Sequence, residues 1–142
     1  MAIDGFALSK RDPDPAGAIF ALKIAAEHLS SASASFSSKE FHIAFESSKN
    51  AIRLASSAVM ARDGYISGTL DGTIGYLLQR YPGAFPLERW EHVESLRIDS
   101  GSGLYVMLMG SLGKLKKAGE QDAKEALAIA SAFLETARAE LM

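Results

Sequence analysis

The apolar positions of this chain recur at steps of three and four residues, which is the spacing of amphipathic α-helices, and the longest such stretch runs from Ser37 to Arg62. Its inward stripe and the residues that widen the apolar surface are Phe41, Ile43, Ala44, Phe45, Ser48, Ile52, Leu54, Ala55, Ala58, Val59 and Ala61. The remaining polar strip is narrow and consists of Glu46, Asn50, Arg53 and Ser57. A helix of this kind is buried on most sides, so we expect it at the centre of a helical bundle.

Both ends of this central helix carry sequence signals. Ser37 and Glu40 have the spacing of a capping box, and Phe36 with Phe41 has that of a hydrophobic staple. At the other end, Gly64 follows a basic last turn, which is the arrangement of a glycine C-cap. We therefore predict a helix that starts near Ser37 and stops at Gly64.

Apolar patterns on either side of the central helix predict further helices. In chain order, they are a helix capped by Asp14 with Pro15 at its first position, a short helix capped by Asp71, a helix opened by Pro86 that resumes after Gly103, and a last helix from Asp122 to the C-terminus. Residues 30–35 form either a short connection or a helical continuation, and residues 65–69 form a turn. No alternating strand pattern of useful length is present.

These elements predict an all-α fold. We expect an arm over residues 1–13 that is flexible or strand-like, followed by a single domain over residues 14–142. That domain is an antiparallel up-and-down bundle of four long helices plus one or two short ones, because the connections are short.

Composition limits the classes of function. The chain has 142 residues, a formal net charge of −2 and no cysteine. The charge argues against a global positive field that would hold nucleic acid or a membrane surface, and leaves room only for a local basic patch. The absence of cysteine excludes disulfides, thiolate metal sites and cysteine nucleophiles. With Asp4 near its start and no apolar run longer than Leu104–Met109, the sequence favours a cytoplasmic protein without a membrane span.

No catalytic motif is complete. His28, His42 and His92 are scattered and lack the carboxylate spacing of a metal site, so we expect neither a metal nor another cofactor. The segment Ser100–Gly103 follows a helix rather than a strand, and its composition favours a hinge over a phosphate-binding loop.

Chemistry-bearing residues concentrate on the helix that Pro86 opens. They are Arg89, Trp90, His92, Glu94, Arg97 and Asp99. Arg97 shares the inward stripe of Trp90 and Val93, and an arginine near a core needs an acidic or carbonyl partner. One interpretation is a structural ion pair of Arg97 with Asp99, with Glu94 or with an acid on the central helix. The other is an anion site, and its candidate ligand-binding residues are Arg97, Asp99, Arg89 and His92.

The order of these features resembles the HEPN domain family. The first helix of that family has the pattern "A…L…A..HL..A", which residues 18–32 follow, and a long Ala- and Ser-rich second helix corresponds to Phe41–Gly64. An "L-R-x-x-A-D-Y-G"-like signature ends its fourth helix, and Leu96–Gly101 stands loosely in that place. The closing helix corresponds to Ala123–Leu141. The resemblance implies a bundle of four or five helices that is commonly dimeric.

Many HEPN domains are toxin ribonucleases or partners of minimal nucleotidyltransferases, and the ribonucleases use an arginine followed four to six residues later by a histidine. Here only two residues separate Arg89 from His92, and no histidine follows Arg97. The resemblance therefore implies a non-catalytic homodimer that binds a nucleotide, RNA or a partner protein, with a link to a toxin–antitoxin or nucleotidyltransferase system. The alternatives are an atypical ribonuclease that uses Arg89 and His92 or Arg97, and a purely structural or assembly protein.

Overall fold

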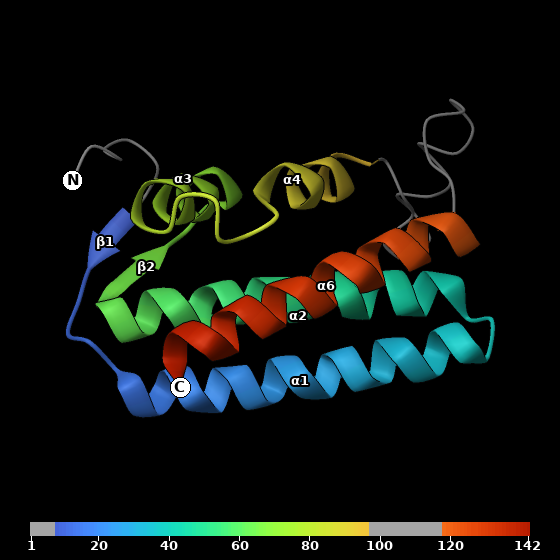
Figure 1. The fold of residues 1–142 in the computed structure, drawn as a ribbon, viewed down its shortest axis with the longest axis horizontal. Coiled ribbons are helices and arrows are strands. Elements are labelled where there is room, and N and C mark those ends of the chain that lie inside the picture. The colour runs from blue at the N-terminus through green and yellow to red at the C-terminus, as the bar shows by residue number, and fades with distance from the viewer. Residues whose placement is uncertain (1–7, 97–117) are drawn as a thin grey trace.

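The computed structural model describes residues 8–96 and 118–142, and these form five helices and one small sheet (Figure 1). In chain order the elements are β1 (Leu8–Lys10), α1 (Pro15–Ser37), α2 (Phe41–Asp63), β2 (Tyr65–Ser67), α3 (Leu70–Arg80), α4 (Leu87–Ser95) and α6 (Glu120–Leu141). The all-α prediction is confirmed. Arg97, Asp99 and the segment from Ser100 to Lys117 lie outside the described residues.

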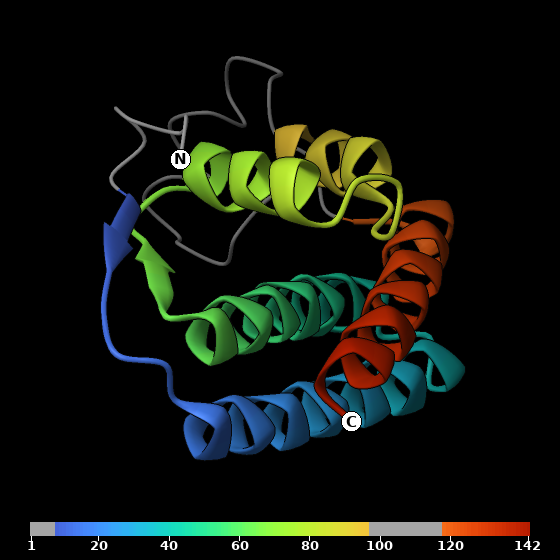
Figure 2. The same cartoon turned by 60° about the vertical axis from the view of Figure 1, so that its left-hand side comes forward.

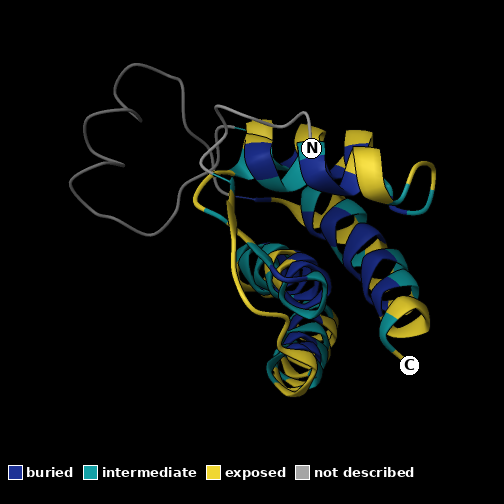
Figure 3. Cartoon of the chain, turned by 90° about the vertical axis from the view of Figure 1, so that its left-hand side faces the viewer, coloured by how far each residue is buried: buried dark blue, intermediate teal, exposed yellow. Residues whose placement is uncertain are grey.

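Three long helices form the body of the fold. Helices α1 and α2 run antiparallel and are joined by a short turn, and α6 packs along both of them (Figure 1). Helices α3 and α4 lie on the side of α2 away from α1, so α2 has neighbours on both sides (Figure 2). Helix α1 keeps a broad exposed face (Figure 3).

The central position predicted for α2 is confirmed. It contributes more buried residues than any other described helix: Ala44, Phe45, Ser48, Ala51, Ile52, Ala55, Ser56, Ala58, Val59 and Met60. Small residues dominate this set, which lets neighbouring helices approach closely without voids. The polar strip at Arg53 and Ser57 stays exposed, and it faces the region where α3 and α4 pack.

The turn between α1 and α2 differs from the predicted start of the central helix. Helix α1 continues through the Ser/Ala run to Ser37, so Ser37 cannot cap α2. The N-cap of α2 is Glu40, without a side-chain hydrogen bond, and Lys39 takes a positive φ of 63° to reverse the chain. The predicted contact between Phe36 and Phe41 is confirmed, with ring centroids 5.4 Å apart.

The C-terminal end of α2 organises the N-terminal arm. Gly64 adopts the predicted left-handed cap, with φ 88°, and its carbonyl accepts the backbone N–H of Arg11 at 2.9 Å. Strand β1 pairs antiparallel with β2, so that Lys10 lies opposite Tyr65. The turn predicted for residues 65–69 is therefore wrong at Tyr65–Ser67, because the arm supplies a partner strand.

Three of the remaining helix ends differ from the prediction. Thr69, not Asp71, caps α3 and accepts the N–H of Gly72 at 3.0 Å. Gly119 is the N-cap of α6, and its N–H donates to the Asp122 carboxylate at 3.0 Å. Helix α4 ends at Ser95, earlier than predicted, and Leu96 is already extended. The Ser95 hydroxyl donates to the His92 carbonyl at 2.7 Å and so competes with continuation of the helix.

An aromatic cluster holds α4 against α6. The Trp90 ring packs edge-on against Phe133, with ring centroids 5.2 Å apart. Phe85 also packs against the Phe133 ring, with centroids 4.6 Å apart. Trp90 and Phe133 are buried almost completely, so this contact fixes the position of α4 over the body. None of the described helices is both long and apolar enough to cross a bilayer.

Candidate functional site

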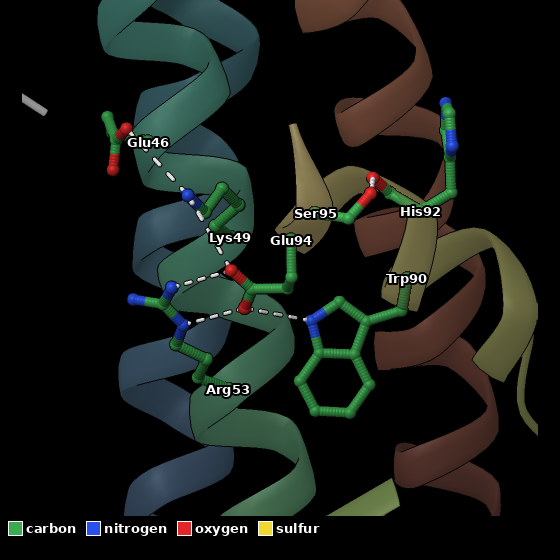
Figure 4. Close-up of polar contacts among 7 residues, drawn as sticks. All are labelled: Glu46, Lys49, Arg53, Trp90, His92, Glu94 and Ser95. Carbon is green, nitrogen blue, oxygen red and sulfur yellow. Dashed lines mark hydrogen bonds and ion pairs between the residues drawn. The ribbon is translucent and has the colours of Figure 1, made fainter. Parts of the chain in front are cut away.

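A carboxylate on α4 and a guanidinium on α2 form a bidentate contact between the two helices. Glu94 accepts Arg53 Nε at Oε2 (2.9 Å) and Arg53 Nη2 at Oε1 (2.7 Å), which is a bidentate pair (Figure 4). The Trp90 indole N–H also donates to Oε2, at 3.1 Å. The Glu94 side chain is only 6% exposed, whereas that of Arg53 is 50% exposed. The pair therefore has a buried anionic side and an accessible cationic side.

A second cation completes the charge balance. The Lys49 ammonium lies 3.6 Å from Glu94 Oε1 and 3.9 Å from Glu46. Burial of Glu94 opposes its ionisation, but the hydrogen bonds and charge of Arg53, with Lys49, outweigh that effect and hold the pKa of Glu94 below its usual value. Glu94 is consequently ionised at neutral pH and is unsuited to act as a general base.

A cavity of about 320 Å³ adjoins this pair, within the size range of small-molecule sites. Its lining residues come from α2, from the segment joining β2 to α3, and from α4: Arg53, Ser57, Ser67, Gly68, Thr69, Leu70, Thr73, Trp90 and Glu94. Four of these side chains carry a hydroxyl group, and the first turn of α3 forms part of the wall. A second cavity of about 170 Å³ shares Ser57, Ser67 and Thr73 with it. We call the two together the α2–α3 groove.

The cavity offers donors rather than a catalytic group. The hydrogen bonds of Arg53 to Glu94 use Nε and Nη2, and Nη1 points away from the carboxylate (Figure 4). The start of α3 adds the positive end of a helix dipole, with the N–H groups of Gly72 and Thr73 already bonded to Thr69. The side-chain hydroxyl of Ser57 makes no hydrogen bond to another described residue. These groups can bind an anion and hydroxyl groups, and no histidine is among them.

The described residues predicted as a ligand site do not come together at this cavity. Arg89 and His92 are exposed on α4, and the His92 side chain points away from Glu94 (Figure 4). His92 lines a shallow surface depression with Glu88, Glu91 and Ser95, whose two carboxylates disfavour a phosphate ligand. Arg97 and Asp99 lie outside the described residues. The predicted pairing of Arg97 with Glu94 therefore falls outside the described residues, and the described partners of Glu94 are Arg53, Lys49 and Trp90.

Sequence reasoning missed Arg53 as a functional candidate. It placed Arg53 on the polar strip of the central helix, seven residues after Glu46, whereas the structure pairs this half-exposed side chain with Glu94 of α4. A cation on the strip of an otherwise apolar helix was the available signal. Only the structure shows that the acidic partner of Arg53 is Glu94 on α4.

A second polar cluster ties three helix ends together. The Asp63 carboxylate accepts the hydroxyl groups of Tyr76, at 2.7 Å, and Tyr81, and it also accepts Arg62. Arg62 in turn donates to Tyr81 and to the backbone carbonyl of Glu140. Burial of Asp63 raises its pKa, but the hydrogen bonds from the two tyrosines and Arg62 outweigh it, so the pKa lies below its usual value. Burial and the Asp63 carboxylate raise the pKa of Tyr81 to about 12.

Neither Asp63 nor Tyr81 lines any of the described cavities, so we assign this cluster to the attachment of α3 and of the C-terminus to α2.

Over residues 8–96 and 118–142, no group of three or more His, Cys, Asp or Glu side chains is arranged to hold a metal ion. Comparison of the chain with protein-family models, with curated proteins and with solved structures finds no match.

Proposed function

We propose that this chain is a non-catalytic, HEPN-like binding protein and that its ligand is a nucleotide held in the α2–α3 groove. The observation that carries the proposal is Arg53, fixed by the bidentate Glu94 pair at the wall of a hydroxyl-lined cavity of about 320 Å³. A phosphate group suits Arg53 Nη1 and the positive end of the α3 dipole, and ribose hydroxyls can donate to the side-chain oxygens of Ser57, Ser67 and Thr73, of which Ser67 and Thr73 already donate to the Thr69 carbonyl.

The groove lining contains no histidine, which supports binding rather than catalysis. Cleavage of RNA through the ribose 2′-hydroxyl needs a base near that hydroxyl, and an imidazole is the usual choice. The polar residues of the larger cavity are Arg, Ser, Thr, Trp and Glu94, whose carboxylate is already engaged by three donors, and the smaller cavity adds Arg11 and Tyr65. A ligand bound there would be held without being attacked.

Calorimetric titration tests the proposal. The intact chain is titrated with adenosine 5′-monophosphate, and with adenosine as the uncharged comparison. We expect binding of the monophosphate and a loss of affinity in Arg53→Gln, because this change removes the charge while keeping a partner for Glu94. The control Arg80→Gln removes an exposed arginine outside the groove and should leave affinity unchanged. Equal binding by wild type and Arg53→Gln, or no binding of any nucleotide, would contradict the proposal.

The atypical ribonuclease is the alternative, and its residues are Arg89 and His92 or Arg97, of which the structure describes the first two. The carboxylates of Glu88 and Glu91 beside His92 weaken it, because they repel the phosphate backbone of RNA. Incubation with total RNA decides between the two. Our proposal expects no cleavage, whereas cleavage that disappears in both Arg89→Gln and His92→Ala would establish the ribonuclease.

A homodimer is part of the same proposal, and exposed apolar side chains support it. Phe20 on α1 is 66% exposed and Ile43 on α2 is 51% exposed, so both side chains are available to pack against a second copy of the chain. Light scattering at micromolar concentration should give twice the mass of the 142-residue chain. A monomer under these conditions would remove both the dimer and the assembly-protein alternative.

A further inference from the structure

The α2–α3 groove has a positively charged residue at each end. Arg53 lines the larger cavity and Arg11 lines the smaller one, and the two cavities meet at Ser57, Ser67 and Thr73. The two arginines come from different elements, α2 and the segment after β1, and sequence reasoning linked neither to a site. Their placement at opposite ends of one groove points to the shape of the ligand.

Arg53 and Arg11 differ in whether they form an ion pair within the chain. Arg53 is paired with Glu94, whereas Arg11 forms no ion pair with any residue in the described ranges. Arg11 is exposed, and its backbone N–H is fixed to the Gly64 carbonyl at 2.9 Å. Its guanidinium therefore sits on an anchored backbone and keeps its full hydrogen-bonding capacity for a ligand.

The helix geometry of α2 sets the length of the groove. Asp63 is the last residue of α2 and lies ten residues after Arg53, so their backbones are about 15 Å apart at 1.5 Å per residue. Arg11 is held beside that end of α2 through Gly64. Because arginine side chains are long, the guanidinium groups of Arg11 and Arg53 can bind two phosphate groups that are closer together than the backbones of the two residues.

The middle of the groove is neutral. The shared residues Ser57, Ser67 and Thr73 carry hydroxyl groups, and Met60 and Ile66 add an apolar wall on the Arg11 side. Neither cavity is lined by an acidic residue other than Glu94, and that carboxylate is already neutralised by Arg53 and Lys49. A ligand with an uncharged, hydroxylated centre and an anionic group at each end matches this order of groups.

We infer that the groove binds a nucleoside carrying two phosphate groups, one held by Arg53 and the other by Arg11, with the sugar at Ser57, Ser67 and Thr73. The inference rests on the proposed nucleotide function and adds the second phosphate and its residue. Two sources share this chemistry: a free nucleoside 3′,5′-bisphosphate and the 5′-phosphorylated end of an RNA strand. Both place phosphates on either side of one ribose.

Calorimetry with four ligands tests the inference: adenosine 3′,5′-bisphosphate, the 5′- and 3′-monophosphates, and a 5′-phosphorylated dinucleotide. Wild type should bind at least one of the two ligands with two phosphate groups about tenfold more tightly than either monophosphate, since one further charge-assisted contact has that effect. In Arg11→Gln this advantage should disappear, while affinity for the monophosphate that Arg53 holds stays the same. Lys10→Gln removes the neighbouring charge, which does not line the groove, and should keep the advantage.

The outcomes separate the two claims. The inference falls, and the proposed function stands, if a monophosphate binds through Arg53 and neither ligand with two phosphate groups binds more tightly. The same holds if the tighter binding of the two-phosphate ligand survives in Arg11→Gln. If no nucleotide binds at all, both fall. A preference for the bisphosphate assigns the groove to a free nucleotide, and a preference for the dinucleotide assigns it to an RNA end; either upholds the inference.

Discussion

Arg53 on α2 and Glu94 on α4 form two parallel hydrogen bonds across 41 residues of sequence. The pair joins the central helix to the layer that α3 and α4 form above it (Figure 2). It also orients a guanidinium at the wall of the larger cavity. A single contact thus serves both the packing of α4 and the proposed binding site.

Truncation of Glu94 should be costly. Glu94→Ala leaves Lys49, Arg53 and the Trp90 indole without their acceptor, so we expect a loss of about 2 kcal/mol in the free energy of unfolding. Urea denaturation measures it. The matched control is Glu91→Ala on the exposed face of α4, which should stay within about 0.5 kcal/mol of wild type. In a double-mutant cycle, Arg53→Ala should cost much less once Glu94 is already absent; additive effects would show that the two residues are not coupled.

The Asp63 cluster predicts a specific response to acid. The pKa of Asp63 is lower in the folded chain than its ordinary value of 3.8. Its contribution to stability is therefore present above about pH 4 and is lost as the pH falls through the folded pKa. Asp63→Asn should destabilise the protein by about 1–3 kcal/mol at neutral pH, and by progressively less below pH 4.

Urea midpoints across the acidic range measure this convergence. Asp12→Asn, an exposed acid that no described contact involves, should track wild type at every pH. A difference between Asp63→Asn and wild type that stays constant down to the lowest pH would mean that the carboxylate charge of Asp63 plays no part.

Two glycines with positive φ offer a matched pair of substitutions. Gly64 has φ 88°, and a Cβ there would lie 2.8 Å from the backbone carbonyl oxygen of Arg11. Gly83 has φ 76°, and a Cβ there would meet nothing within 4 Å. Both alanine variants carry the cost of a left-handed residue, about 1–2 kcal/mol, but only Gly64→Ala must also displace the arm.

Thermal unfolding should therefore rank Gly64→Ala as clearly less stable than Gly83→Ala. Because Arg11 is fixed through Gly64, the same variant should weaken binding in the groove. Equal stability of the two variants would indicate that the arm does not lie against the end of α2.

The central position of α2 gives a further test. Ile52 is fully buried, so Ile52→Ala should cost about 2–5 kcal/mol. Glu46→Ala lies on the polar strip, where its pair with Lys49 is long at 3.9 Å, and should change stability by no more than about 0.5 kcal/mol. A urea midpoint of Ile52→Ala near that of wild type would contradict the packing described for α2.

The helices were predictable because their signals are local. The apolar spacing of α2, the Gly64 cap and the Asp14–Pro15 start all act within a few residues of the chain, and the structure confirms each. The start of α2 was predicted wrongly because Ser37 can serve either as a cap or as the last residue of α1. The Ser/Ala run before it has enough helix propensity to continue α1, and this decides the matter.

The pairing of the two strands and the composition of the site could not be predicted from the sequence, for a different reason. Strands of three residues, such as Tyr65–Ser67, are too short to show alternation, and their pairing with Leu8–Lys10 is non-local. The groove likewise combines Arg11, Arg53 and Glu94, which are far apart in sequence, and no periodicity relates them. The sequence analysis favoured Arg89 and His92 instead, which are close along the chain and do not line the groove.

The one tryptophan of the chain allows the most direct test of the proposed site. Trp90 lines the larger cavity, and its indole N–H donates to Glu94, so it gives a single resonance beside the proposed phosphate position. We would titrate the ¹⁵N-labelled chain with adenosine 5′-monophosphate and record amide and indole shifts. The account predicts that the Trp90 indole and the amides of residues 67–73 shift together. No change at these signals, or changes confined to Glu88, Glu91 and His92, would contradict it.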